Sequence, residues 1–408
     1  MDRVQKIAVT ISVVVILALA AVLGIFLWRE SHGGGSKTPD GTLVLDGTDQ
    51  PGDEDSPGTG ENGNGAEDPD DGQDGENGTG FDDPNGNGAD EPEVPELVDV
   101  SLVFTGDVML GNTVLGNYDR SGLDGILSAY LQNEMIGADI TMINQEFPFS
   151  TRGTPMPDKT YTFRVDPSYV KVFREMGVDI VSLANNHALD YGTDALEDSF
   201  TTLDGAGIPY VGAGDSKERA EQAVFFESGG RTVGYLSASR VIPVVSWNIE
   251  NNQPGLFCTY DSTALEAAIR RTREQCDYLV VYVHWGIERQ DYPEQYQRTL
   301  AQAYIDAGAD LVVGAHPHVP QGIEYYKGKP IVYSLGNFIF NPNMVKTYML
   351  KVIFDTAGES RLTVIPVVTA SALTRNLEGQ EAQEMYEYLQ GISYGVTIDG
   401  NGRVTPQQ

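Results

Sequence analysis

From residue 98 onward, apolar runs of strand length alternate with amphipathic stretches of helix length. The runs that have the pattern of strands cover residues 100–105, 140–144, 180–184, 232–237, 278–284, 311–315 and 331–334. The stretches with helical periodicity between them cover residues 167–176, 193–205, 262–274 and 293–307. This alternation predicts βα units around a largely parallel inner sheet, so we expect an α/β fold.

The positions of three glycines and the pattern of the last sixty residues add to this prediction. Gly177, Gly205 and Gly308 each follow a helical stretch, where a residue in the left-handed conformation commonly closes a helix. Two antiparallel strands and a final helix are expected at residues 348–355, 361–368 and 381–390. We therefore expect the folded domain to cover residues 97–408.

The first thirty residues carry a long apolar segment. Residues 7–28 contain no charge, and about twenty such residues span the hydrocarbon core of a bilayer. Arg3 and Lys6 precede the segment, which predicts a cytoplasmic N-terminus and an extracellular main domain. A cleaved secretory signal with a cleavage site at residues 18–21 is the alternative, but the apolar run continues past these small residues. We expect residues 1–30 to be a single-pass anchor in the cell membrane.

Residues 31–96 are rich in Gly, Asp, Glu, Asn and Pro and contain almost no large apolar residue. Nineteen acidic residues stand against the single base Lys37, which makes −18 of the formal net charge of −33. Such a segment cannot bury enough apolar surface to offset its chain entropy. We expect a disordered acidic linker that extends by self-repulsion and holds the domain away from the membrane.

The charge balance also limits the binding partners. Nucleic acid is excluded, because phosphate binding needs clustered Lys and Arg, and the basic runs of this sequence are short. An anionic polymer would be repelled as well, unless a metal ion mediates the contact.

Cys258 and Cys276 are the only cysteines of the chain. In an oxidising exterior they could form a disulfide, and buried free thiols are the alternative. Their spacing does not suggest a metal site.

Residues that can bind metal ions gather directly after the predicted strands. Ligand groups lie just beyond the carboxyl ends of strands in α/β sheets, and four of the five histidines occupy such positions. The residues concerned are Asp107, Glu146, Asn186, His187, His284, His316 and His318. Any one of them alone is more often structural: Asp107 could cap a helix, and Asn186 could form a turn. Together they form a nitrogen and oxygen donor set that suits Zn, Mn or Fe, so we expect a divalent-metal site.

The pair His316 and His318 is the most specific single motif in this set. Residues two apart on an extended segment point the same way, so both side chains could reach neighbouring ions. His32 lies in the predicted linker and is not expected to take part.

Six ordered sequence elements carry a family resemblance: "GDVML", "NQE", "ANNHALDYG", "HWG", "GAHPH" and "SLGNFIF". In order and approximate spacing they resemble the motif series of the CapA family of poly-γ-glutamate capsule synthesis, across residues 106–340. The predicted anchor is similar to that of membrane-bound members of this family. The resemblance implies an extracytoplasmic component of capsule synthesis and export, working on poly-γ-glutamate or another envelope polymer beside membrane synthetase subunits.

The CapA family is similar in turn to the calcineurin-like metallophosphoesterases, which implies a four-layer αββα sandwich with two metals between the sheets. By this resemblance, Asp107 and His318 bind the first metal, and Glu146 bridges both metals. The second metal is bound by Asn186, His284 and His316, while His187 is catalytic and contacts the leaving group or the developing charge of a substrate. The implied substrate-binding residues are Asn144, Asn185, Gly336 and Asn337.

One departure from the phosphoesterase pattern bears on activity. That pattern has a second histidine two residues after the first Asp, and this chain has Met109 there. A thioether is a poor ligand for hard divalent ions, so the resemblance implies a weaker or empty first site. Three functions follow as hypotheses: a capsule synthesis component, a stand-alone metal-dependent hydrolase of phosphoesters or amides, and a non-catalytic polymer-binding module.

Overall fold

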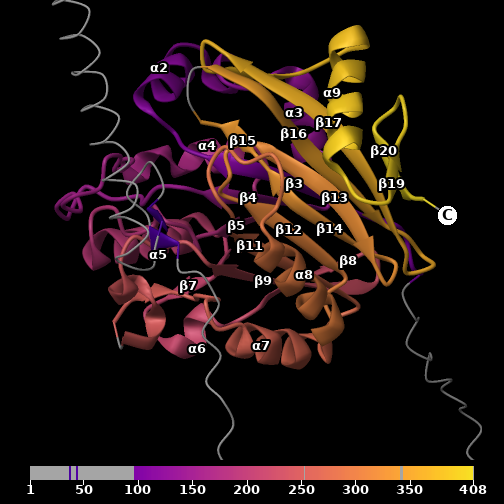
Figure 1. Ribbon diagram of the computed structural model, residues 1–408. Helices are drawn as coiled ribbons and strands as arrows, with labels where there is room; N and C mark the ends of the chain where they lie inside the picture. Colours follow the sequence, from indigo (N-terminus) through magenta and orange to yellow (C-terminus); the bar gives the residue numbers. More distant parts are fainter. Residues whose placement is uncertain (1–35, 38–42, 45–95, 252, 341–342, 408) are drawn as a thin grey trace, which may run out of the picture. The chain divides into compact units, whose positions relative to one another are not determined.

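The computed structural model describes residues 36–37, 43–44, 96–251, 253–340 and 343–407 (Figure 1). The chain divides into two units, Met1–Gly47 with Leu97–Gln408 and Thr48–Glu96, and every described helix and strand belongs to the first. The predicted anchor and most of the predicted linker lie outside the described residues. Within the described residues, no helix combines the length and the apolar character needed to cross a membrane.

Two β-sheets form the framework of the domain (Figure 1). One has the strand order β13-β14-β12-β11-β9-β8, in which β9, β11, β12 and β14 are parallel. Its strands are β8 Val224–Ser228, β9 Arg231–Ser239, β11 Tyr278–His284, β12 Leu311–Ala315, β13 Pro320–Tyr326 and β14 Lys329–Leu335.

The other sheet has the order β19-β20-β17-β16-β3-β4-β5-β6, in which β3, β4, β5 and β6 are parallel. In addition, β15 pairs with β3 and β18 pairs with β17. Its strands are β3 Val100–Val108, β4 Ile140–Gln145, β5 Ile180–Ser182, β6 Tyr210–Val211, β15 Asn337–Ile339, β16 Asn343–Phe354, β17 Ser360–Ala370, β18 Leu373–Asn376, β19 Val396–Ile398 and β20 Arg403–Pro406.

Most of the longer helices lie in the connections between parallel strands, as the βα alternation predicts. The α-helices are α2 Asn112–Ser121, α3 Ala129–Ile136, α4 Val170–Glu175, α5 Thr193–Ala206, α6 Lys217–Ala220, α7 Thr263–Arg273, α8 Gln295–Ala307 and α9 Gly379–Ile392. Short 3₁₀ turns are η1 Gly122–Gly125, η2 Pro167–Tyr169, η3 Val245–Trp247 and η4 Ile249–Asn251. Two small antiparallel pairs are β1 Ser36–Lys37 with β2 Leu43–Val44, and β7 Ala213–Gly214 with β10 Gly255–Leu256.

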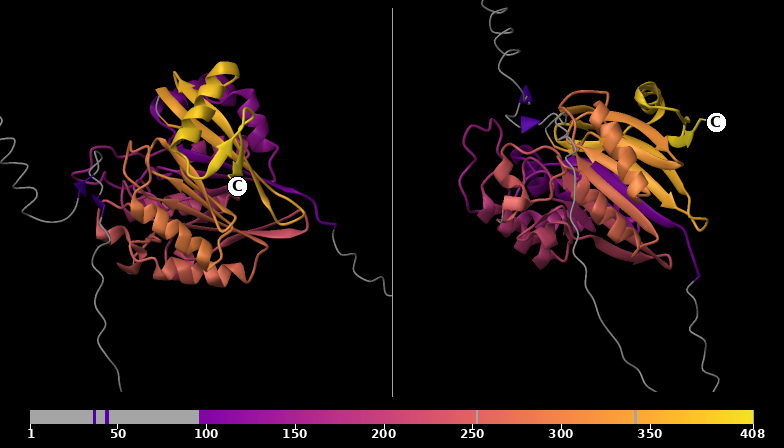
Figure 2. Two further views of the ribbon diagram at one scale, coloured as in Figure 1. Left: turned by 45° about the vertical axis from the view of Figure 1, so that its right-hand side comes forward. Right: turned by 60° about the horizontal axis from the view of Figure 1, so that its bottom comes forward.

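The inner faces of the two sheets pack on each other (Figure 2). Phe104 on β3 and Tyr235 on β9 are both fully buried, with ring centroids 6.4 Å apart. Met142, Tyr282 and Val313 belong to the same buried cluster. Strands buried on both faces have continuous apolar runs, which is why these segments were recognisable in the sequence.

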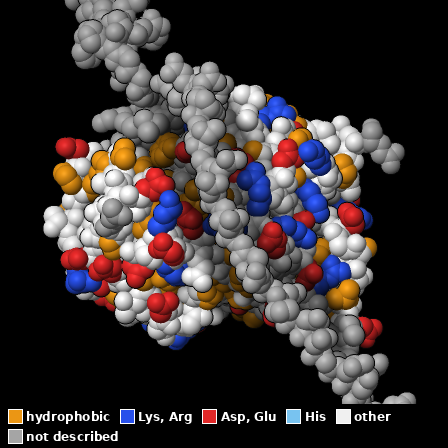
Figure 3. All heavy atoms as spheres, turned by 90° about the horizontal axis from the view of Figure 1, so that it is seen from below, with side chains coloured by type: hydrophobic (Ala, Val, Ile, Leu, Met, Phe, Trp, Pro, Cys, Tyr) orange, Lys and Arg blue, Asp and Glu red, His pale blue; other side chains and the backbone are white. Residues whose placement is uncertain are grey.

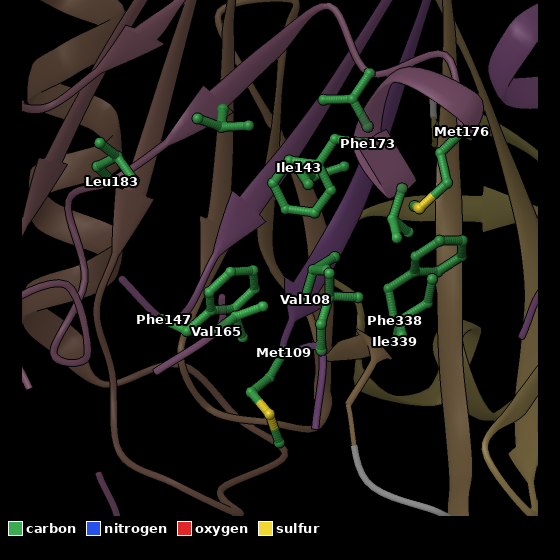
Figure 4. Close-up of a cluster of buried hydrophobic side chains, with 14 of the residues drawn as sticks. Val108, Met109, Ile143, Phe147, Val165, Phe173, Met176, Leu183, Phe338 and Ile339 are labelled. Atoms are coloured by element: carbon green, nitrogen blue, oxygen red, sulfur yellow. The ribbon is translucent and has the colours of Figure 1, made fainter. Parts of the chain in front are cut away.

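Helices cover the outer faces of both sheets. Phe147, Phe149 and Phe173 form edge-to-face contacts with centroids 4.9 and 5.4 Å apart in the cluster between one sheet and its helices (Figure 4). On the other sheet, Leu265 of α7 and Tyr304 of α8 pack in a second outer cluster. The order helices, sheet, sheet, helices is therefore a mixed α/β fold, as expected.

The structure differs from the predicted fold in two details. Gly205 does not close its helix, because α5 continues to Ala206 and the left-handed position falls on Gly207, with φ of 70°. Gly177 and Gly308 have positive φ values of 71° and 124°, as expected. The fold also contains two sheets of mixed direction, where the alternation alone predicted a largely parallel one.

The cysteines are free thiols, which decides between the two alternatives left by the sequence. Cys258 is buried and Cys276 is partly buried. Burial raises the pKa of the Cys276 thiol to about 11 and also raises that of Cys258. Since the thiolate is the reactive form, neither thiol is activated for chemistry.

Candidate metal centre

The candidate site lies where strand ends of both sheets meet. Asp107, near the end of β3, pairs in register with Asn144 on β4. His284 ends β11, beside the end of β12. Two residues before these positions, the Tyr282 hydroxyl donates a 3.1 Å hydrogen bond to the carbonyl oxygen of Thr105, which joins the two sheets directly at the site.

Three ligand residues converge in this place. Among the described residues, Asp107, Glu146 and His318 form the group of acidic and histidine side chains close enough to hold an ion, with ligand atoms within 4.8 Å of one another. Asp107 and Glu146 are fully buried, and His318 Nδ1 lies 3.0 Å from Asp107 Oδ2. Buried carboxylates need a compensating cation, because their removal from water is costly. The donor set suits a borderline or hard divalent ion.

The electrostatics of His318 show how strongly this place favours positive charge. Burial by itself lowers the pKa of His318, but the carboxylates of Glu146 and Asp107 outweigh burial and raise it to about 10. A divalent cation bound by the same carboxylates would compete with the imidazole proton and release it. Charge and donor chemistry therefore both fit a divalent metal ion.

His284 contacts Glu146, and Asn186 and His316 lie next to His284. His284 Nε2 is 2.9 Å from Asn186 Oδ1 and 3.3 Å from Glu146 Oε1, and the rings of His284 and His316 have centroids 4.7 Å apart. All four side chains are fully buried. Burial, and then the neighbouring His316 and His318, hold the pKa of His284 well below its ordinary value. A neutral imidazole is the form that binds a metal.

The backbone that presents His316 and His318 is strained. Both have positive φ, 95° and 58°, which is uncommon for residues other than glycine and is found at functional sites. Their ring centroids lie 5.8 Å apart. The sequence predicted that His316 and His318 point the same way because their segment is extended. The segment is not extended: the chain bends after β12, and this bend brings the two side chains together.

Asn144 and Asn185 are fully buried among the candidate ligands. Asn144 Nδ2 lies 2.8 Å from Asp107 Oδ1 and 3.3 Å from His284 Nδ1. Asn185 Nδ2 donates to Asn144 Oδ1 at 3.1 Å, and Asn185 Oδ1 accepts from the backbone nitrogen of His187 at 3.0 Å. Such contacts orient metal ligands. The substrate contacts expected of both residues stay a prediction.

Gly336 and Asn337 adjoin the first ligand group. Asn337 Oδ1 lies 2.7 Å from His318 Nδ1, and β15 places Asn337 opposite Asp107. The Asp107 amide donates to the carbonyl oxygen of Gly336 at 2.9 Å. A Cβ on Gly106 would lie only 1.6 Å from that oxygen, so the two backbones can approach this closely because Gly106 has no side chain.

His187 lies beside these ligands in its own polar cluster. Its Nδ1 is 2.8 Å from Asp190 Oδ2 and 3.0 Å from Lys159 Nζ, and the Phe163 ring packs at a tilt of 33° against it with centroids 4.5 Å apart. Sequence reasoning identified His187 but missed both polar partners. Asp190 stands within the "ANNHALDYG" element, three residues after His187, and could have been found there. Lys159 lies in no such sequence element, because it is far from His187 in the sequence and reaches the site through a long loop.

Comparison with known proteins identifies the family. The family model described as "Bacterial capsule synthesis protein PGA_cap" matches residues 101–342, which contain every candidate ligand. The chain belongs to this family. The PGA biosynthesis protein CapA of Bacillus subtilis is 32% identical over 68% of this chain and 74% of its own length. The capsule biosynthesis protein CapA of Bacillus anthracis is 32% identical over 61% of each chain.

Solved structures add little to this family assignment. A phosphatase structure from Mycoplasma pneumoniae is similar over 72% of this chain and 99% of its own, with 13% identity and a TM-score of 0.43. A likeness at that score supports no conclusion about function.

Met109 does not belong to the ligand group of this PGA_cap domain. It is 8% exposed, packs in the apolar cluster on the outer face of its sheet (Figure 4), and lines a cavity of about 710 Å³ together with Phe163 and Phe340. Asp107, Glu146 and His318 converge without a ligand from position 109. The weaker first site implied by Met109 stays a prediction.

A second cavity, of about 640 Å³, opens at the site itself. His318 and Asn337 line it, together with the basic residues Arg289 and Lys346 and the acidic residues Glu288 and Asp291. The Lys346 ammonium lies 4.0 Å from the ring centroid of Tyr388. On the described part of the face in Figure 3, basic and acidic side chains are interspersed. Two basic and two acidic side chains therefore line this cavity, so its charged lining does not by itself favour an anionic ligand.

Proposed function

We propose that this protein is a membrane-anchored, extracytoplasmic component of poly-γ-glutamate capsule synthesis that acts through a divalent-metal site. The observation that carries the proposal is the convergence of Asp107, Glu146 and His318 within the segment that the capsule synthesis family model matches. Two packed sheets with outer helices also support the metallophosphoesterase-type αββα architecture expected from the sequence. Mn, Zn and Fe are the candidate ions.

The chain's own residues have separate tasks in this proposal. Asp107, Glu146 and His318 would hold the ion, with Asn186, His284 and His316 as the second ligand group. When bound, a divalent ion would polarise a carbonyl or phosphoryl oxygen of the substrate. Asp190 orients His187, which serves as proton donor if a bond is cut and as hydrogen-bond donor if none is cut.

Local positive charge resolves an electrostatic conflict. Poly-γ-glutamate is strongly anionic, and this chain has a formal net charge of −33, so attraction over a broad surface is unfavourable. A bound divalent cation would supply the missing attraction for one carboxylate or carbonyl, because the basic Arg289 and Lys346 of the cavity are balanced by the acidic Glu288 and Asp291. The surrounding acidity then keeps the rest of the polymer moving.

The anchored topology has a direct test. Because Arg3 and Lys6 precede the apolar run of residues 7–28, external protease on intact cells should release a soluble fragment that begins within residues 31–95. Immunoblotting and N-terminal sequencing of the released fragment measure this. Protection of the fragment until the membrane is opened would show that the orientation is reversed.

The capsule function is tested in the native host. Deletion of the gene should abolish surface γ-linked glutamate polymer, and an anchored wild-type copy should restore it, as measured by antibody labelling and amino-acid analysis. Normal polymer in the deletion strain would overturn the proposal. If the host instead needs the protein for phosphoester or wall-peptide turnover, the function is that of a stand-alone hydrolase.

A His187→Ala copy separates chemistry from binding. The pairing of His187 with Asp190 at 2.8 Å beside the ligand group favours a hydrolytic role over a purely structural one. We expect this copy to restore less than about a hundredth of the polymer at normal protein level, since positioned acid catalysis contributes about 10² to 10⁴ in rate. Full restoration would support a polymer-binding module, with membrane synthetase subunits as its partners.

A further inference from the structure

A lysine is buried against the candidate catalytic histidine. The side chain of Lys159 is 1% exposed, and its Nζ lies 2.6 Å from Asp190 Oδ1 and 3.0 Å from His187 Nδ1. The same ammonium donates to the carbonyl oxygen of Asn186, one of the candidate metal ligands. One cation therefore contacts the acid, the histidine and the ligand backbone at once.

Burial of this ion pair costs desolvation free energy on folding, which favours a positioning role over a purely stabilising one. Burying a lysine and an aspartate removes both charges from water, and such pairs often add nothing to stability over apolar residues of similar size. Asp190 is fully buried, and the Lys159 ammonium also lies 5.5 Å from the ring centroid of Trp247. A buried ion pair that touches a candidate catalytic group is a feature of functional sites.

Asp190 also fastens the loop that carries Lys159. The backbone nitrogen of Phe163 donates to Asp190 Oδ2 at 2.7 Å, and the backbone nitrogen of Met156 donates to the carbonyl oxygen of Asp190 at 2.8 Å. The Phe163 ring then packs at a tilt against the His187 ring. Residues 156–163 thus form a segment that packs against His187, and Asp190 binds this segment at Met156, Lys159 and Phe163.

We propose that Lys159 is a positioning residue that locks His187 in the orientation needed at the metal centre. Nδ1 has one in-plane hydrogen-bonding position, so it either donates to Asp190 or accepts from Lys159, and the buried Lys159–Asp190 pair holds both groups against it. Phe163 packs at a tilt against the same ring, so the ring cannot turn without breaking these contacts. Nε2 is thereby directed away from Lys159. This inference rests on the proposed function only for the statement that His187 acts on a substrate.

The experiment uses the full-length protein loaded with Zn²⁺ and carrying Lys159→Met, which removes the charge and keeps the length of the side chain. Histidine-selective ¹⁵N NMR measures the tautomer of His187, whose signals are assigned by their loss in His187→Gln. The wild type should show a single His187 tautomer. Lys159→Met should lose that single-tautomer signal. Zinc content should stay at the wild-type level, because Lys159 is not a ligand. With a measurable substrate, kcat should fall and KM should change little, and Lys159→Arg should restore part of kcat.

Trypsin provides a second readout that needs no substrate. In the wild type the bond after Lys159 should be protected, and Asp190→Asn should expose it, with cleavage at least about a hundredfold faster because a buried pair is broken. Asp198→Asn is the matched control, since Asp198 pairs with the exposed Arg152 at the start of the same loop and does not contact His187. If Lys159→Met does not fold, the cleavage rate of Asp190→Asn still tests the buried pair, because that variant keeps Lys159 and its trypsin site.

The outcomes separate the two proposals. An unchanged His187 signature in Lys159→Met, or an unchanged cleavage rate in Asp190→Asn, would overturn the positioning role whatever the activity. A changed signature and faster cleavage in a protein that turns over no substrate would uphold the positioning role and remove the catalytic part of the proposed function.

Discussion

Replacing Asp107 by asparagine is expected to remove most of the divalent metal from the purified full-length protein. The ligand atoms of Asp107, Glu146 and His318 lie within 4.8 Å of one another, and Asp107→Asn takes one of the two buried negative charges from this group. Loss of a residue that only orients a ligand costs about 10- to 100-fold in affinity, so loss of a ligand charge should cost more than about 100-fold. Elemental analysis after dialysis measures the ion count, which should fall from near one per chain to near zero.

The comparison variants make this result specific. Asp306→Asn removes an exposed carboxylate that pairs with Lys327 far from the strand ends of the site, and its metal content should equal that of the wild type. His316→Ala tests the second ligand group. Metal loss in His316→Ala together with full retention in Asp107→Asn would contradict the expectation, and would place the ion where the Met109 argument puts it.

Gly106→Ala is expected to be the most destabilising single-methyl change near the site. Its Cβ would lie 1.6 Å from the Gly336 carbonyl oxygen and 2.7 Å from the Gly336 carbonyl carbon, so β3 and the loop after β14 must separate. Overpacking against backbone costs about 3 kcal/mol, which corresponds to a fall in Tm of roughly 4 to 5 °C for a folded domain of this size. Thermal unfolding followed by circular dichroism measures this. Because the Asp107 amide bonds the same oxygen, metal content should fall as well.

Gly205→Ala is the matched control, and it is expected to raise the free energy of unfolding rather than lower it. Gly205 lies within α5, and nothing approaches its Cβ position within 4 Å. Alanine reduces the freedom of the unfolded chain, so the free energy of unfolding should rise by about 0.5 to 1 kcal/mol. Equal stability of the two alanine variants would refute the close-approach argument for Gly106.

The amino-acid sequence alone determined most of the long strands and the identity of the candidate ligands. β11 and β12 have the predicted bounds, residues 278–284 and 311–315, because both are buried on both faces and apolar except for the final His284 of β11. Asp107, Glu146, His284 and His316 stand directly at strand ends, so their convergence followed from the rule that ligand groups collect there. The family also followed from the sequence, since its motifs are local elements in a fixed order.

Only the tertiary structure decided how distant segments complete the site. Lys159 reaches His187 from a loop, and Asn337 reaches His318 through β15, and neither contact has a periodicity that a sequence could show. The convergence of His316 and His318 depends on positive φ values at both, a conformation that neither residue favours by itself and that the surrounding packing imposes. Local patterns encode burial and element type, whereas side-chain contacts across the sheets depend on how the elements pack.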